Sequence, residues 1–312
     1  MKKLYVFFIL LFTSAGANAQ YNNEWITFPN GQLQSSQQYF RISIWKEGVY
    51  RLSYNDLQTA GIDTNNWFQP SRFQLYYQGK EQSIEVIDNG QQGIFRSGDY
   101  IQFYGKINTS KLDTALYDSG EVAVNPYFSL FNDTAVYFLT YNPLVTNAKR
   151  VVIENDNNFS LYTPQTEYTF TDLKEYHREY NIAVRDGEGV ADNSYTSGEG
   201  FALQKDTCNA LHPYTEIFNV LSPSGTTGEV EVSIAGGNTD VHHLKILVNG
   251  QEYIDDTFFG YDLRKYTFTV TNLTPGNNSI QVVPQTGSGV YMNYLYLGYI
   301  SLKYNKSYSF SA

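Results

Sequence analysis

Short runs of strand-forming residues follow one another along most of this chain, each bounded by turn residues. In residues 229–234, Glu-Val-Glu-Val-Ser-Ile, apolar and polar side chains alternate strictly, which predicts a strand with one buried and one solvent-facing side. Asn249-Gly250 predicts a tight hairpin, because this pair adopts the two positive φ angles of a type I′ turn. With 16% aromatic and only 17% charged residues, the chain is too aromatic for disorder. The sequence therefore predicts an all-β protein.

The strand-forming runs fall into two groups. The first lies at residues 39–45, 48–52, 73–77, 83–87, 100–104, 136–141 and 150–154. The second lies at residues 215–221, 229–235, 243–248, 252–257, 266–271, 279–283 and 291–304. The first group predicts an N-terminal β-rich domain of barrel-like or sandwich-like form over residues 20–155. The second predicts a jelly-roll-type β-sandwich over residues 201–306, followed by a tail at 307–312.

Three segments depart from the strand pattern. Residues 54–60 predict one short helix, because Ser53 can cap its first turn and Gly61 can end it. Residues 105–135 carry few strand signals and predict a long irregular excursion within the first domain or across its edge. Residues 156–200 are polar and acidic and predict an irregular connector, in which the spacing of Leu173, Tyr176 and Tyr180 favours a second short helix.

Residues 1–19 have the form of a signal peptide. Lys2 and Lys3 precede an apolar run at residues 4–12, and the small residues end in Ala17-Asn18-Ala19. This pattern predicts cleavage between Ala19 and Gln20. The apolar run is too short to span a bilayer, and no later segment is a transmembrane candidate. We therefore expect an exported protein of the periplasm, the outer-membrane surface or the extracellular space; Gln20 in place of Cys argues against a lipid anchor.

The charge distribution excludes one class of partner. The formal net charge is −10, and no window gathers Lys and Arg into a patch. A nucleic-acid or anionic-membrane surface would need such a patch. We therefore expect no nucleic-acid partner.

Residue types that carry catalysis are few and scattered. Cys208 and His212 form the only Cys/His pair close in sequence, but they precede Pro213 in a loop-like stretch with no feature that lowers a thiol pKa. His242 and His243 are adjacent in a strand, so their rings point to opposite faces and cannot share a metal ion. His177 has no second ligand at a recognisable spacing. The sequence thus offers no catalytic residue, and an independent hydrolase is the least supported function.

Acidic residues give one weak cofactor candidate. Asp186, Glu188 and Asp192 lie in a glycine-containing loop and could place oxygens around Ca²⁺, although a solvated acidic loop is the simpler interpretation. No other metal or cofactor is expected. The remaining acidic candidates show no pairing of a general acid with a base; they are Glu24, Glu47, Glu81 and Glu85.

Tyrosines permit two interpretations, a sugar-stacking platform or ordinary core packing. In strands, alternate residues face a core, where a Tyr buries its ring while its hydroxyl finds a partner. The candidates are Tyr76 with Tyr77, Tyr100 with Tyr104, and the group Tyr291, Tyr294, Tyr296 and Tyr299. A sugar platform requires several members of a group to be exposed on one face.

A set of short phrases, taken in order, resembles the N-terminal region of the type IX secretion system sortases, which belong to the gingipain-like cysteine peptidases of Bacteroidota. The phrases lie at residues 39–44, 46–57, 60–62, 73–76, 98–105 and 137–140, with weaker continuation at 198–201, 248–250 and 292–304. The resemblance spans nearly the whole chain after residue 19. It implies β-rich modules that precede a caspase-like peptidase domain.

No stretch of this sequence matches the catalytic domain of that family, so the resemblance transfers no catalytic residue. It implies that the chain is not itself an enzyme, and that it presents or docks a peptidase domain in cis or contacts secretion-system proteins. It also makes Asp113-Thr114-Ala115 and Asp133-Thr134-Ala135 similar to O-glycosylation sites of that phylum, with Thr114 and Thr134 as acceptors. The alternative hypothesis is a secreted carbohydrate-binding or adhesion β-sandwich, whose partner is a glycan.

Overall fold

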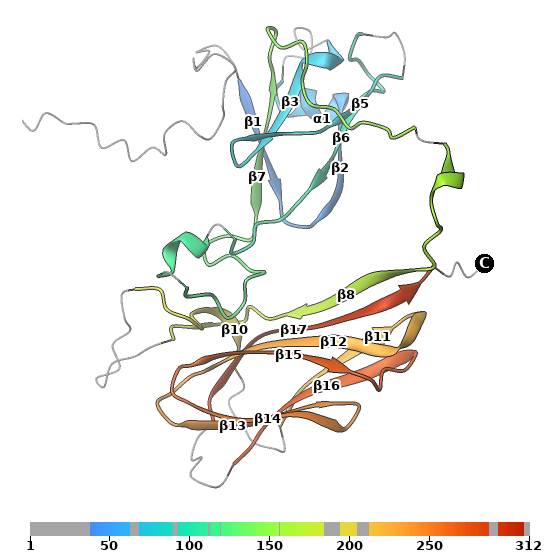
Figure 1. The fold of residues 1–312 in the computed structure, drawn as a ribbon. Helices are drawn as coiled ribbons and strands as arrows, with labels where there is room; N and C mark the ends of the chain where they lie inside the picture. The colour runs from blue at the N-terminus through green and yellow to red at the C-terminus, as the bar shows by residue number, and fades with distance from the viewer. Residues whose placement is uncertain are drawn as a thin grey trace, which may run out of the picture. The chain divides into compact units, whose positions relative to one another are not determined.

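The computed structural model describes residues 38–62, 69–89, 93–111, 113–118, 120–155, 157–183, 194–204, 212–286 and 293–308. The chain divides into two compact units: the first takes in residues 1–107 and 134–155, and the second takes in residues 108–133 and 156–312. Nearly all regular elements in both units are antiparallel strands (Figure 1). The predicted all-β class is confirmed. The predicted signal peptide and its cleavage site at Ala19 and Gln20 lie outside the described residues.

The first unit is built from two antiparallel sheets, ordered β1-β7-β3-β4 and β2-β6-β5. Their strands are β1 (Tyr39–Ile44), β2 (Gly48–Ser53), β3 (Phe73–Tyr77), β4 (Lys80–Gln82), β5 (Glu85–Ile87), β6 (Tyr100–Gly105) and β7 (Ala135–Tyr141), and a 3-10 turn η1 (Pro70–Arg72) precedes β3. Side chains of both sheets meet in one core, with Leu75 and Ile101 fully buried. Among the described strands neither sheet closes on itself, so the unit is sandwich-like rather than a barrel.

The short helix α1 (Tyr54–Thr59) begins where the sequence predicts. The Ser53 hydroxyl accepts a hydrogen bond from the Asp56 backbone N–H at 3.1 Å, and the Asp56 carboxylate accepts one from the Ser53 N–H at 2.9 Å. This reciprocal capping satisfies two backbone donors that the helix itself cannot. The hydrogen bonds from Ser53 also hold the pKa of Asp56 below its usual range.

One strand of the first group does not form. Of the run predicted at residues 150–154, only Arg150 makes an isolated bridge, to Ile84, and the residues after it leave the sheet. β5, which begins directly after Ile84, pairs with β6, and no described strand pairs with residues 151–154. Val152 is consequently 86% exposed.

The second unit is a jelly roll of two facing sheets. One sheet follows the order β15-β12-β17-β10-β9, with β8 also paired to β17, and the other follows β11-β16-β13-β14. The strands are β8 (Glu167–Glu175), β9 (Glu179–Asn181), β10 (Gly200–Gln204), β11 (Tyr214–Val220), β12 (Pro223–Gly236), β13 (Val241–Val248), β14 (Gln251–Phe259), β15 (Leu263–Val270), β16 (Gly276–Pro284) and β17 (Leu295–Ser307); 3-10 turns are η2 (Asp113–Leu116) and η3 (Phe159–Leu161). With β8 and β10 together in the place of the first strand, this order is the eight-stranded jelly roll.

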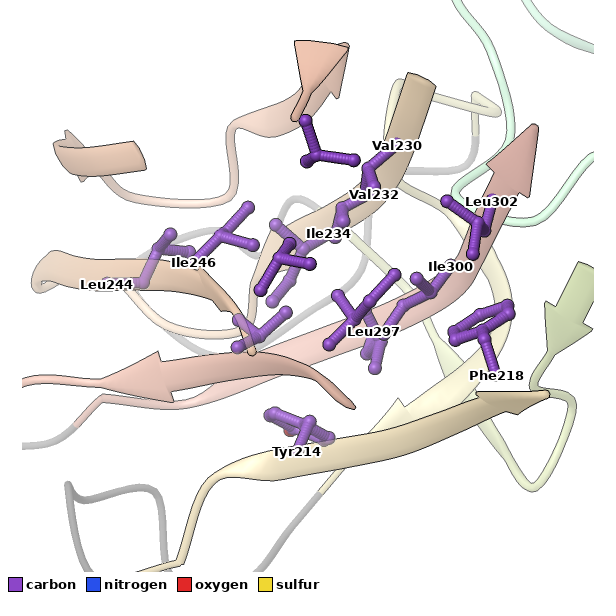
Figure 2. Packing of buried hydrophobic residues seen from close by; sticks show 14 of the residues in the cluster. Tyr214, Phe218, Val230, Val232, Ile234, Leu244, Ile246, Leu297, Ile300 and Leu302 are labelled. Carbon is purple, nitrogen blue, oxygen red and sulfur yellow. The ribbon is translucent and has the colours of Figure 1, made fainter. Parts of the chain in front are cut away.

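The core of the jelly roll lies between its two sheets (Figure 2). Val230, Val232 and Ile234 of β12 are fully buried, so the strict alternation of the sequence correctly identifies the inner face. The predicted hairpin after β13 also forms, with φ of 50° at Asn249 and 80° at Gly250.

The central strand β17 buries Leu297 and Ile300 against the same core, although they are an odd number of residues apart. The pairing with β12 shifts its register here: Ser233 pairs with Tyr299, and Ile234 with Leu297, which leaves Gly298 as an extra residue. A β-bulge of this kind resets which side chains face inward.

The predicted irregular connector, residues 156–200, is wrong in part. It contains β8 and β9, and β8 pairs with β17 over nine residues. The helix expected from the spacing of Leu173, Tyr176 and Tyr180 is wrong, since β8 runs to Glu175. Pairing with a strand more than 120 residues away overrides the local pattern.

Residues 108–133 belong to the second unit and not to the predicted domain at 20–155. The backbone of Val124 lies on the outer face of the jelly-roll sheet: its N–H bonds to the Glu199 carbonyl at 3.3 Å, and its carbonyl accepts from the buried Ser233 hydroxyl at 2.8 Å. A Cβ on Gly298 would lie 2.1 Å from the Val124 carbonyl oxygen, so only glycine allows this approach. Small residues on the sheet thus make room for a segment far away in sequence.

We predict that Gly298→Ala separates residues 108–133 from the sheet. The substitution should destabilise the second unit by about 1–3 kcal/mol, because the added methyl group has no free volume. Urea denaturation and limited proteolysis within residues 108–133 would measure the two effects.

The matched control is Gly225→Ala on β12, where an added Cβ meets nothing within 4 Å. It should change stability by less than about 0.5 kcal/mol. Equal effects of the two substitutions would contradict the proposed packing of Val124 on Gly298.

Candidate functional site

Two tyrosine–glutamate pairs lie where residues 108–133 contact the jelly roll. The Tyr299 hydroxyl donates to the Glu231 carboxylate, and the Tyr127 ring packs edge-on against the Tyr299 ring with centroids 5.0 Å apart. Tyr299 is 1% exposed. Burial raises the pKa of the Tyr299 phenol above its ordinary value, and the hydrogen bond to Glu231 raises it further.

A second pair surrounds Glu199, just before β10. The Tyr180 hydroxyl donates to the Glu199 carboxylate at 2.6 Å, and the Tyr117 hydroxyl donates to the Glu199 backbone carbonyl at 2.9 Å. Burial is the main cause of the raised pKa of both phenols, and the Glu199 charge adds to it. These groups hold the segment in place, and the arrangement supplies no nucleophile with an adjacent base.

The same segment leaves apolar side chains facing solvent. Leu116 is 42%, Val122 38% and Phe131 70% exposed. One face of the segment is therefore anchored by polar contacts, and other side chains are free to meet a partner.

The histidines are used in local contacts. His242 is fully buried with Nδ1 3.0 Å from the Asn293 side-chain oxygen, whereas His243 is partly exposed and lies 2.6 Å from the Asp255 carboxylate. The prediction that their rings point to opposite faces is confirmed. His177 stacks on the Phe128 ring at 4.2 Å. In the described residues no group of three or more His, Cys, Asp or Glu side chains could hold a metal ion.

Several residues singled out in the sequence lie outside the described residues: Cys208, Glu24, Tyr291 and the calcium candidates Asp186, Glu188 and Asp192. His212 is described and exposed. Thr114 is exposed in η2 and donates to the Lys111 carbonyl at 2.8 Å, and Thr134 is half-buried. O-glycosylation at these two threonines stays a prediction.

The three groups of tyrosines differ in how far their side chains are exposed. Tyr76 is buried, and Tyr77 stacks on Tyr137 with ring centroids 4.4 Å apart. Tyr299 is buried, and Tyr294 and Tyr296 are half-buried, so these three do not form an exposed platform on β17.

Tyr100 and Tyr104 of β6, in contrast, lie on the outward face of the β2-β6-β5 sheet. Ile101 and Phe103 between them point into the core, so Tyr100, Gln102 and Tyr104 face outward. Val49 pairs directly with Tyr104, and the two side chains are 66% and 54% exposed.

Polar contacts order this face, which we call the β6 face; it comprises Val49, Arg51, Glu85, Ile87, Tyr100, Gln102 and Tyr104, and Glu47 of the β1–β2 turn reaches it. The Tyr104 hydroxyl donates to Glu47 at 3.1 Å, and the Gln102 amide donates to Glu85 at 3.4 Å. The hydrogen bond to Glu47 raises the pKa of Tyr104. Glu81 lies elsewhere, accepting from the Lys149 N–H at 2.8 Å.

Sequence reasoning missed Val49 as a residue of the β6 face. Counting alternation outward from Ile101 and Phe103 would assign Tyr104 to the solvent face, but only the pairing of β2 with β6 shows that Val49 lies beside it. Trp45 lies in the turn after β1 and is 69% exposed.

Comparison with known proteins shows a likeness at the level of fold. No protein-family profile matches the chain. No curated protein matches it either. The crystal structure of dimeric latent PorU from Porphyromonas gingivalis is similar over 87% of this chain, with a TM-score of 0.54 and 13% sequence identity. The chain covers 24% of that PorU chain.

Smaller matches are to carbohydrate-binding modules. A CBM36-1 domain of a multidomain xylanase from the hindgut metagenome of Trinervitermes trinervoides matches 44% of this chain at 12% identity, and the chain covers 95% of that domain, with a TM-score of 0.26. A CBM36 module in complex with calcium and xylotriose matches 40% of this chain at 14% identity, with 97% of that module covered and a TM-score of 0.26.

Within the described residues, no helix is long and apolar enough to cross a membrane.

The buried phenols predict alkaline sensitivity of the second unit. Because the pKa of Tyr299 is raised in the folded state, its bond to Glu231 contributes stability below the unfolded-state pKa of about 10, and this is lost as pH rises toward the folded-state pKa. Tyr299→Phe should therefore be less stable than the parent by about 1.5–3 kcal/mol at neutral pH. The difference should shrink above about pH 10.

Urea denaturation across a pH series measures this difference. Tyr308→Phe, which removes an exposed phenol, is the matched control and should follow the parent at every pH. If the difference in unfolding free energy between Tyr299→Phe and the parent stays constant with pH, the hydrogen bond from Tyr299 to Glu231 is not its source.

Proposed function

We propose that this chain is the non-catalytic N-terminal region of a PorU-like sortase of the type IX secretion system, or a relative that keeps the same modules. Its β-rich units would present or dock a caspase-like peptidase domain, supplied in cis or by a secretion-system partner. The signal-peptide pattern of residues 1–19 supports export of the product.

The observation that carries the proposal is the extent of the structural match. A single PorU chain is similar to 87% of this chain, and neither unit alone amounts to that share. The match therefore includes parts of both units. The ordered sequence phrases, which resemble the same class of sortase, run through both units as well. A match that includes both units supports a shared pair of modules more than a likeness of one common sandwich would.

The contacts in the second unit support a docking role rather than catalysis. Residues 108–133 are anchored by the bond from the Tyr117 hydroxyl to the Glu199 carbonyl, by the backbone bonds of Val124 and by the packing of Tyr127 on Tyr299. The exposed Leu116 and Phe131 of that segment offer apolar area to a partner. Aromatic side chains that become buried in an interface are frequent binding hot spots.

Two measurements test the proposal. The coding DNA after codon 312 should continue into an alternating β/α domain that carries a Cys and a His, or the same genome should encode such a domain separately. That peptidase domain, produced on its own, should associate with this chain in sedimentation velocity. Phe131→Ser should weaken the association at least about tenfold, as expected for a hot-spot side chain.

Phe259→Ser is the matched control, since Phe259 is 63% exposed on β14, outside the segment. It should leave the association unchanged. A stop codon at this point, together with no association of the family's peptidase domain from the same genome, would show the proposal to be wrong.

A further inference from the structure

The β6 face combines an exposed aromatic ring with polar side chains that are already ordered. Tyr104 is 54% exposed, a large value for such a ring in a folded domain, and Val49 paired with it is 66% exposed. The Arg51 guanidinium lies 3.9 Å from the centroid of the Tyr100 ring. This stacking and the bonds of Tyr104 to Glu47 and of Gln102 to Glu85 hold the side chains in place before any ligand arrives.

The size of the face distinguishes between classes of ligand. The sheet is three strands wide, and β2 and β6 have six residues each, so the face measures roughly 15 by 20 Å at about 4.8 Å between strands and about 3.4 Å per residue. Its area of about 300 Å² is well below the ~800 Å² that each partner buries in a standard protein interface. The face is therefore suited to a small, elongated ligand.

The charged and aromatic side chains of the β6 face further restrict the class of ligand. Two carboxylates, Glu47 and Glu85, stand beside one guanidinium, Arg51, so an anionic ligand such as a nucleotide is disfavoured. Aromatic rings carry a negative face that attracts the C–H groups of a saturated ring. Carboxylate, amide and guanidinium groups together offer donors and acceptors for hydroxyl groups.

We propose that the β6 face binds a neutral oligosaccharide. Tyr104 stacks on the C–H face of a sugar ring, and Val49 extends the apolar surface. Glu47 and Gln102 hydrogen-bond its hydroxyl groups, with Arg51 beside Tyr100 at the other end. This site is separate from the tyrosines of β17, and it does not rest on the proposed docking of a peptidase domain.

The test uses the purified chain on an array of neutral plant and bacterial oligosaccharides, followed by calorimetric titration with the best-retained glycan. We expect retention of at least one glycan. Tyr104→Ala should weaken binding about tenfold, the loss expected for an aromatic stacking partner. Tyr104→Phe keeps the ring and should weaken binding less than Tyr104→Ala.

Phe259→Ala removes a comparably exposed aromatic side chain from the second unit and should leave glycan binding unchanged. Far-ultraviolet circular dichroism verifies that each variant is folded. Failure of the parent chain to retain any neutral glycan, or binding that survives Tyr104→Ala undiminished, would overturn the proposal. If the parent chain retains no glycan and Tyr104→Ala abolishes its association with the peptidase domain, the β6 face binds a protein partner instead.

Discussion

The second unit depends on the burial of β17 on both faces. Its inner side chains, such as Leu297 and Ile300, belong to the jelly-roll core, while Tyr299 on the outer side is covered by residues 108–133. Along its edges β17 pairs with β12 on one side and with β8 and β10 on the other. A strand buried on both faces needs apolar side chains on its inner face, and any polar group on its outer face needs a hydrogen-bond partner. The bulge at Gly298 turns Leu297 and Ile300 inward and Tyr299 outward.

The outer contacts of β17 explain why a polar segment of low strand content can be part of a stable domain. Residues 108–133 contribute few apolar side chains to the main core, but Val124 lies in a small buried cluster with Ala202 and Ala235. Its backbone groups bond to Glu199 and Ser233, and therefore are not left unpaired when water is excluded. Close approach of backbone to sheet replaces the side-chain packing that the segment lacks.

The sequence predicts the elements whose signals are local. The alternation around Val230 and Val232, the Asn249-Gly250 turn and the Ser53 cap depend on neighbours within a few residues, and each is found where expected. The position of residues 108–133 and the strand β8 depend on partners more than 100 residues away, namely Ser233, Gly298 and β17. The local sequence pattern of those segments does not indicate which distant residues they contact.

The same limit applies to the tyrosines. Tyr299 and Tyr104 both occur in strands, flanked by apolar residues, and both donate their hydroxyl to a glutamate. Tyr299 is buried because another segment covers its face, whereas Tyr104 stays more than half exposed with Val49 beside it. A buried phenol contributes to stability through its satisfied hydrogen bond, but an exposed ring gains little for the fold. Tyr104 and Val49 instead form a contiguous exposed apolar surface, which is the kind of surface that binding sites use.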